Sequence, residues 1–185
     1  MANSDAYSGF RPAYHFTGGT IREQEYTIAD LYGSNILAGD MVKSTGTGRN
    51  IAVCVAGDRA LGVFAGCRYV AANGDVVFRG YWPASTDAIG TIVAYVYDDP
   101  WIVFEVQAGG TLGIAATDVN QMADMVSTHA GSTSTGRSGQ EVDDVGQLGL
   151  KVLGLIDRPA NDYGVNAKVY VLINEHENRS ALTAV

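Results

Sequence analysis

Residues 67–79 of this 185-residue chain read CRYVAANGDVVFR, and this stretch indicates the fold class most directly. Apolar and β-branched residues lie on both sides of Asn73-Gly74, the dipeptide that two-residue hairpin turns prefer. A turn at this dipeptide predicts two antiparallel strands in which Arg68 lies opposite Arg79. Two arginines directly across a ladder repel each other unless a carboxylate lies between them. We therefore expect an acid beside this pair, either from the same chain or donated by another subunit.

A second hairpin is predicted over residues 91–107, where two apolar runs flank the turn sequence DDP. In that register both faces of the strand pair are apolar. Such a pair lies either centrally between two layers or against another chain. Tyrosine and tryptophan are enriched in protein interfaces, so the aromatic residues of this region are interface candidates. They are Tyr95, Tyr97, Trp101 and, shortly before the hairpin, Trp82.

The rest of the chain alternates short apolar runs with turns, and it holds 23 glycines but only 4 prolines. Short strands with such turns are typical of a sandwich or barrel. One helix is expected, in which Thr117 caps residues 118–127 and apolar residues follow one face. The expected fold class is all-β: a small β-sandwich or barrel with one short helix and an extended N-terminal arm. Further strands are expected near residues 23–28, 36–43, 50–56, 60–66, 148–156 and 167–174.

Residues 1–20 lack periodicity but carry several aromatic side chains, which is typical of a segment that lies on something else. We expect them to form an extended arm, with residues 21–185 as a single β-rich domain. The arm then lies on a neighbouring protein, and deleting residues 1–16 leaves the domain folded. The alternative is an ordinary strand at the edge of its own domain. The interface candidates in the arm are Phe10, Arg11, Pro12 and Tyr14.

Charge and composition exclude several classes of function. The chain carries 12 Lys and Arg against 20 Asp and Glu, a formal net charge of −8. A nucleic-acid binder needs a basic face, as does a protein that binds anionic membranes, so neither partner is expected. There is no run of 18 apolar residues and no apolar stretch near the start, so we expect neither a membrane span nor a signal peptide. Cys54 and Cys67 are interpreted as buried free thiols of a protein made in a reducing cytoplasm.

No motif for enzymatic chemistry stands out. Residues 131–138, GSTSTGRS, fit a phosphate-binding loop, but a helix is predicted before them and a glycine follows them, which argues against that site. The histidines at 15, 129 and 176 have no second ligand at metal-binding spacing. We therefore expect no metal, no cofactor and no enzyme. An alternative is a small hydrolase that uses Ser138 and His129.

Several segments resemble the head decoration, or cement, proteins of tailed phages. They begin with GFRP and GDMV, continue through LGVFAGCRY and YWPA, and extend over nearly the whole chain. The segments are residues 9–12, 39–42, 61–69, 81–84, 93–100, 134–139, 153–157 and 171–176.

This resemblance implies a structural virion protein, made in the bacterial host cytoplasm, that binds the outer surface of the assembled capsid. It would hold neighbouring subunits of the major capsid protein together as a homo-oligomer, a homotrimer being the expected state and a homodimer the alternative. Binding only the expanded shell would stabilise that state by mass action. The arm is the first candidate for contact with the capsid, and the polar loop of residues 128–139 with Arg137 is the second. The remaining alternatives are that the small hydrolase is virion-associated, or that the chain is a tail or baseplate subunit.

Overall fold

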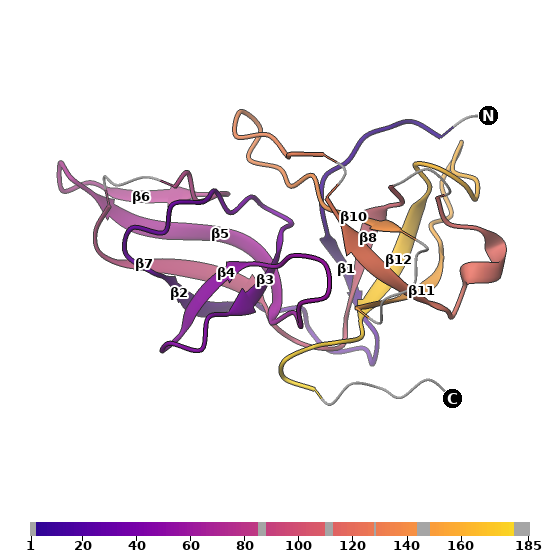
Figure 1. Cartoon of the computed structure of the whole chain (residues 1–185), viewed down its shortest axis with the longest axis horizontal. Coiled ribbons are helices and arrows are strands. Elements are labelled where there is room, and N and C mark those ends of the chain that lie inside the picture. Colours follow the sequence, from indigo (N-terminus) through magenta and orange to yellow (C-terminus); the bar gives the residue numbers. More distant parts are fainter. Residues whose placement is uncertain (1–2, 85–87, 110–112, 128, 144–148, 180–185) are drawn as a thin grey trace.

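The computed structural model describes residues 3–84, 88–109, 113–127, 129–143 and 149–179. Over these ranges the chain is almost entirely β, which confirms the predicted fold class. The strands form two sheets that lie side by side as two lobes (Figure 1). We call them the barrel lobe, with strands β2 to β7, and the sheet lobe, with strand β1 and strands β8 to β12.

Five strands of the barrel lobe close into a ring in the order β3-β4-β2-β7-β5, because β5 also pairs with β3. Strand β6 pairs with β5 and extends the sheet beyond the ring. The strands are β2 (Gln24–Ile28), β3 (Met41–Ser44), β4 (Asn50–Val53), β5 (Gly62–Ala71), β6 (Val76–Arg79) and β7 (Ala88–Tyr97).

The inside of the barrel lobe holds an apolar core. Alternate residues of β7, namely Ile92, Ala94 and Val96, are buried there, as period-2 patterning requires. Trp82 is also fully buried in this core and donates its indole N–H to the carbonyl of Tyr32 at 3.2 Å. Its prediction as an interface residue is therefore wrong, because its side chain packs within its own lobe.

The loop between β5 and β6 is one residue longer than predicted. The amide of Ala71 donates to the carbonyl of Asp75 at 2.9 Å, which leaves three residues in the loop. Gly74 has a φ of 89°, and Oδ1 of Asn73 accepts the amide of Asp75 at 3.1 Å. A type I turn followed by a left-handed glycine is the usual three-residue hairpin loop. Gly74 therefore takes a left-handed conformation as predicted, but in a three-residue loop and not in a two-residue turn.

This extra residue shifts the register of the hairpin. Arg68 lies opposite Phe78, and Arg79 lies opposite Cys67, so the two arginines are not paired across the ladder. The guanidinium of Arg79 lies over the ring of Tyr81, 5.9 Å from its centroid. Because the two arginines do not face each other, no carboxylate is needed between Arg68 and Arg79.

The neighbouring strands of the sheet lobe pair antiparallel, in the order β1-β8-β12-β11-β9-β10. Its edge strand β1 belongs to the expected arm, so this part of the arm is a strand of its own domain. A single parallel bridge from Ala108 to Val142 brings β10 back to the end of β8. The strands are β1 (Arg11–His15), β8 (Ile102–Gln107), β9 (Met122–Val126), β10 (Glu141–Asp143), β11 (Leu150–Leu155) and β12 (Lys168–Ile173).

The hairpin predicted over residues 91–107 is wrong in its pairing, although both strands exist. Strand β7 lies between β2 and β5, whereas β8 lies between β1 and β12 in the other sheet. The chain passes between the lobes at Asp99, whose Oδ1 accepts the amide of Trp101 at 2.9 Å. Strand β8 is buried on both faces, whereas β7 turns alternate residues into the barrel core and leaves the others, such as Tyr95, half-buried on its outer face.

The helix predicted over residues 118–127 is also wrong. A short 3-10 turn covers Ala116–Asp118, and the chain then enters strand β9. Asn120 has a φ of 68°, a left-handed conformation that asparagine tolerates and that ends a right-handed turn. Its amide donates to the carbonyl of Val152 at 2.8 Å, so pairing with the neighbouring strand replaces the helix.

The two lobes share buried side chains at their junction. Met41 and Val63 of the barrel lobe pack in the same apolar cluster as Phe104 of the sheet lobe. Phe10 lies in this cluster and is only 1% exposed, so it is a core residue and its prediction as an exposed interface residue is wrong. The expectation that residues 1–16 are dispensable for folding conflicts with this burial.

Candidate functional site

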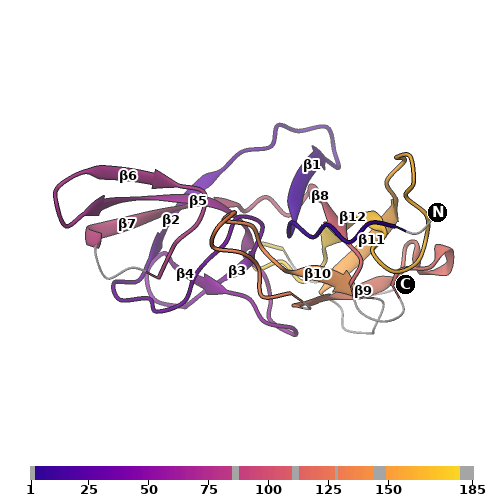
Figure 2. The same cartoon turned by 90° about the horizontal axis from the view of Figure 1, so that it is seen from above.

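The N-terminal segment of residues 3–10 and the loop of residues 129–139 meet at the junction of the lobes, as both views show (Figures 1 and 2). The amide of Phe10 donates to the carbonyl of Gly39 at 2.9 Å. One residue earlier, Ala38 forms a parallel bridge with Arg137 and accepts the amide of Ser138 at 3.0 Å. The two segments that the sequence singled out for capsid contact are therefore held against the same turn of the barrel lobe.

A pocket of ≈ 240 Å³ lies between these two segments and the sheet lobe. Its lining includes one carboxylate, that of Glu105, which pairs with the guanidinium of Arg11 at 3.3 Å and with that of Arg158 at 2.5 Å. Four cationic side chains and one carboxylate therefore line this pocket, in a chain of net charge −8. We call this the cationic pocket; its cations are Arg11, Arg137, Arg158 and Lys168.

Lys168 connects the cationic pocket to the N-terminal segment. Its ammonium donates to the carbonyl of Ala6 at 2.7 Å and also contacts Oε1 of Gln107, which in turn accepts the amide of Ala6 at 2.8 Å. Burial lowers the pKa of Lys168, because leaving water disfavours the charged form. These bonds hold the segment in place, and Arg137 is exposed at the same pocket.

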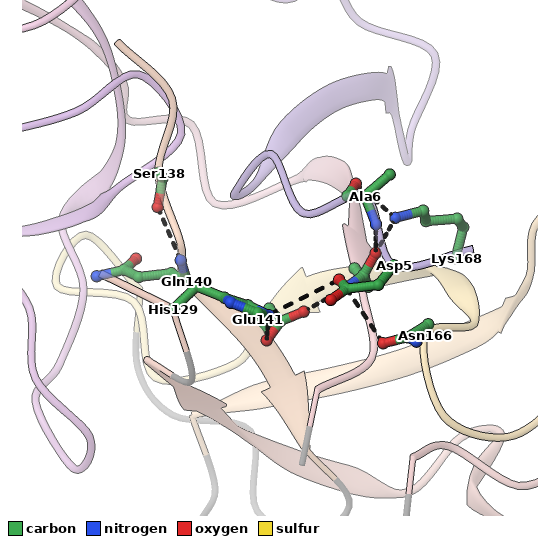
Figure 3. Close-up of polar contacts among 9 residues, drawn as sticks. Asp5, Ala6, His129, Ser138, Gln140, Glu141, Asn166 and Lys168 are labelled. Atoms are coloured by element: carbon green, nitrogen blue, oxygen red, sulfur yellow. Dashed lines mark hydrogen bonds and ion pairs between the residues drawn. The ribbon is translucent and has the colours of Figure 1, made fainter. Parts of the chain in front are cut away.

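A second polar cluster lies behind the segment and joins Asp5, His129 and Glu141 (Figure 3). Nε2 of His129 is 3.7 Å from Oδ1 of Asp5 and 3.7 Å from Oε2 of Glu141. One donor atom from each residue lies within 4.8 Å of the other two. The ring of Tyr7 stacks on the imidazole, with centroids 4.1 Å apart, and fixes its plane. Three such side chains could hold a cation.

Glu141 is the buried member of this polar cluster, with a side chain only 1% exposed. The amide group of Gln107 donates to Oε1 of Glu141 at 2.6 Å and to Oδ1 of Asp5 at 2.8 Å, so it orients both carboxylates. A Cβ atom at Gly109 would lie 2.7 Å from Oε2, so only glycine leaves room for the carboxylate. Burial raises the pKa of Glu141, although the bond from Gln107 opposes that shift.

Three further interface candidates lie on or beside the edge strand of the sheet lobe. Tyr14 is 43% exposed and packs edge-on against Tyr170, and Pro12 next to it is half-buried. Trp101 is half-buried, stacks on Phe16 with centroids 6.3 Å apart, and has the guanidinium of Arg179 over its ring. These side chains are within reach of a partner, but the structure does not bring them into the cationic pocket.

The remaining candidates lie on strands of the barrel lobe. Tyr95 and Arg79 line one shallow hollow of ≈ 320 Å³ together with Phe78, which is 68% exposed. Arg68 is half-buried on β5, and Tyr97 is half-buried on β7, where it packs against the cluster at the junction of the lobes. Burial, together with a hydrogen bond with Glu23, raises the pKa of Tyr97 to about 12.

The geometry does not join Ser138 and His129 as the hydrolase alternative requires. Ser138 is fully buried; its hydroxyl accepts the amide of Gln140 at 3.0 Å and is hydrogen-bonded to Asp40. Nε2 of His129 lies instead toward the carboxylates of Asp5 and Glu141.

Sequence reasoning missed most of the residues in both clusters. Arg158 and Lys168 come from the C-terminal third of the chain, and Asp5 and Glu141 lie at positions that no local spacing connects. One signal was present in the sequence: β12 begins with a charged residue, Lys168, directly before an apolar run, and a charge at the start of a buried strand needs a partner.

Within the described residues no helix is long and apolar enough to cross a membrane. No protein-family model matches the chain, and neither curated proteins nor solved structures show a significant similarity to it. The candidate site therefore rests on the fold alone: it is the cationic pocket formed where the N-terminal segment meets the loop of residues 129–139.

Proposed function

We propose that this chain is a structural protein of a phage virion that binds the outer surface of the assembled capsid and holds neighbouring capsid subunits together. One observation carries the proposal. Arg11 and Arg137, chosen from two separate segments that resemble decoration proteins, line the same cationic pocket. A capsid-binding face composed of both segments needs this convergence.

The pocket fits an acidic side chain or chain terminus of the major capsid protein. Arginine binds a carboxylate through two parallel hydrogen bonds, which adds directional specificity to charge attraction. Because Glu105 satisfies part of the charge of Arg11 and Arg158, an incoming carboxylate would pair first with Arg137. Binding through such exposed cations should weaken as salt is added.

A different surface supports self-association. Strand β6 is the end strand of its sheet, and its exposed side chains Val76 and Phe78 are 58% and 68% exposed. The carbonyl of Asp75 points toward β5, where it accepts the amide of Ala71. Backbone groups alternate along a strand, so those of Val76 and Phe78 point away from β5, toward any strand that pairs with this edge.

The sequence of β6 is complementary to itself in an antiparallel register centred on Val77. In that register Val76 of one copy lies opposite Phe78 of the second copy, and the two exchange backbone hydrogen bonds. Asp75 lies opposite Arg79 of the second copy, which places opposite charges together. The proposed self-contact is therefore a two-fold pair of β6 strands, which favours the homodimer over the homotrimer that the resemblance implies.

Co-sedimentation tests the capsid-binding proposal. The purified chain is mixed with expanded, undecorated capsids of its parent phage and with the same shells before expansion. Saturable binding in a fixed ratio to the capsid subunit, restricted to expanded shells, is the expected result. Binding to isolated tails with none to capsids would instead establish the tail or baseplate alternative.

A further inference from the structure

We propose that Asp5, His129 and Glu141 form a binding site for one divalent first-row transition metal ion, with zinc as its first candidate, and that this ion fixes the N-terminal segment to the sheet lobe. The three side chains come from the N-terminal segment, the loop of residues 129–139 and strand β10. The site lies beside the cationic pocket but uses different side chains, and it does not depend on the proposed function.

The spacing of the donor atoms favours a shared cation over direct hydrogen bonds. Nε2 of His129 lies 3.7 Å from an oxygen of Asp5 and 3.7 Å from one of Glu141, and both separations exceed hydrogen-bond length. Metal–ligand bonds of about 2.0–2.2 Å in a tetrahedral site place neighbouring donor atoms roughly 3.3–3.6 Å apart. Small side-chain movements would bring all three atoms onto one ion.

The second observation is an unsatisfied oxygen that points into this cluster. Oε2 of Glu141 has no hydrogen-bond donor among the described residues, although the side chain is only 1% exposed. A buried carboxylate oxygen without a donor is costly, and a metal ion would satisfy it. Gln107 already binds Oε1, so it directs the other oxygen toward His129 and Asp5 in the manner of an outer-shell residue that orients a metal ligand.

The donor set selects the class of ion. One imidazole nitrogen with two carboxylate oxygens suits zinc and its first-row neighbours. Calcium takes six to eight oxygen ligands and magnesium keeps an octahedral oxygen shell, so a site that offers a nitrogen suits neither. Asp5 is 49% exposed and His129 33% exposed, which leaves an entry path and room for a water ligand.

The proposal is tested by titrating the EDTA-treated, desalted full-length chain with Zn²⁺ in a calorimeter and by measuring its melting temperature with Zn²⁺ and with Ca²⁺. We expect one zinc ion per chain, a higher melting temperature in Zn²⁺, and a smaller response to Ca²⁺. Asp5→Asn, which keeps the hydrogen bond from Gln107, and His129→Ala should each lower zinc affinity by about tenfold or more, since loss of a ligand should cost at least as much as loss of an outer-shell partner. Asp30→Asn, an exposed carboxylate outside the cluster, is the matched control and should bind zinc like the wild type.

A second readout follows the N-terminal segment itself. Zinc should slow chymotrypsin cleavage within residues 3–10 of the wild type and leave the cleavage rate of Asp5→Asn unchanged. The proposal is overturned if wild type and Asp5→Asn bind zinc equally, if neither binds it, or if Ca²⁺ stabilises the chain as much as Zn²⁺ does.

Discussion

Arg11 and Arg137 are far apart in the sequence, and both line the same pocket beside Glu105. The bridge from Ala38 to Arg137 and the hydrogen bond from Phe10 to Gly39 hold their segments against one turn of the barrel lobe. Positive charge is thereby concentrated at the cationic pocket of a chain whose net charge is negative.

Reversing the charge of Arg137 should weaken capsid binding without unfolding the chain. Arg137→Glu places a carboxylate where the proposed partner supplies one, so we expect the dissociation constant from co-sedimentation to rise about tenfold or more. The matched control is Arg22→Glu, since Arg22 is an exposed arginine outside the lining of the pocket. Equal effects of both variants would show that only overall charge matters.

A lysine at the edge of β6 should prevent self-association. Phe78→Lys adds a charge to the proposed two-fold contact, and edge lysines block strand pairing in natural sheets. We expect a monomer by analytical ultracentrifugation and a change in the free energy of unfolding within about 0.5 kcal/mol, because Phe78 is exposed. Val55→Lys, at another exposed apolar residue, is the control and should self-associate like the wild type. A Phe78→Lys protein that still dimerises would exclude this contact.

Removal of the N-terminal residues should destabilise the fold. Phe10 lies in the shared core, so Phe10→Ala should lower the free energy of unfolding by about 3–5 kcal/mol, measured in guanidinium chloride. Phe16→Ala provides the comparison, because Phe16 is 54% exposed and should cost much less. A wild-type unfolding curve for Phe10→Ala would restore the interpretation of residues 1–20 as a detachable arm.

Stability should fall below pH 6.5 through His176. This side chain is fully buried, and burial, with a contribution from the nearby charge of Arg179, lowers its pKa from 6.5 to about 4. The unfolded chain therefore binds a proton that the folded chain rejects, and the stability lost by pH 4 is about 3 kcal/mol. His176→Gln should remove this part of the pH dependence in unfolding measurements between pH 7.5 and pH 4. Parallel profiles for wild type and variant would place the acid sensitivity elsewhere.

Local sequence patterns predicted where the strands lie better than they predicted which strands pair with each other. The apolar runs that became β11 and β12 were correctly predicted, because alternation and β-branched residues directly reflect a half-buried strand. Strands β7 and β8 were also found, but their partners were not. The apolar runs of β7 and β8 would suit either sheet, so the sequence pattern alone could not show that the chain changes lobes at Asp99.

The candidate sites depended on tertiary structure in the same way. Arg11 and Arg137 could be chosen from the sequence, yet only the fold shows that they share a pocket with Arg158. Asp5 and Glu141 belong to no local motif, because neither lies at a metal-binding spacing from His129 in the sequence. Trp82 and Phe10 show the opposite error, since an aromatic residue looks the same in sequence whether it faces a partner or its own core.

The most direct test of the account is a cryo-electron microscopy map of expanded capsids pelleted with the wild-type chain. The account predicts that the N-terminal segment and the loop of residues 129–139 face the shell, with an acidic group of the capsid protein beside Arg137. A map in which the shell contacts only the far end of the barrel lobe, or in which no density is added, would contradict it.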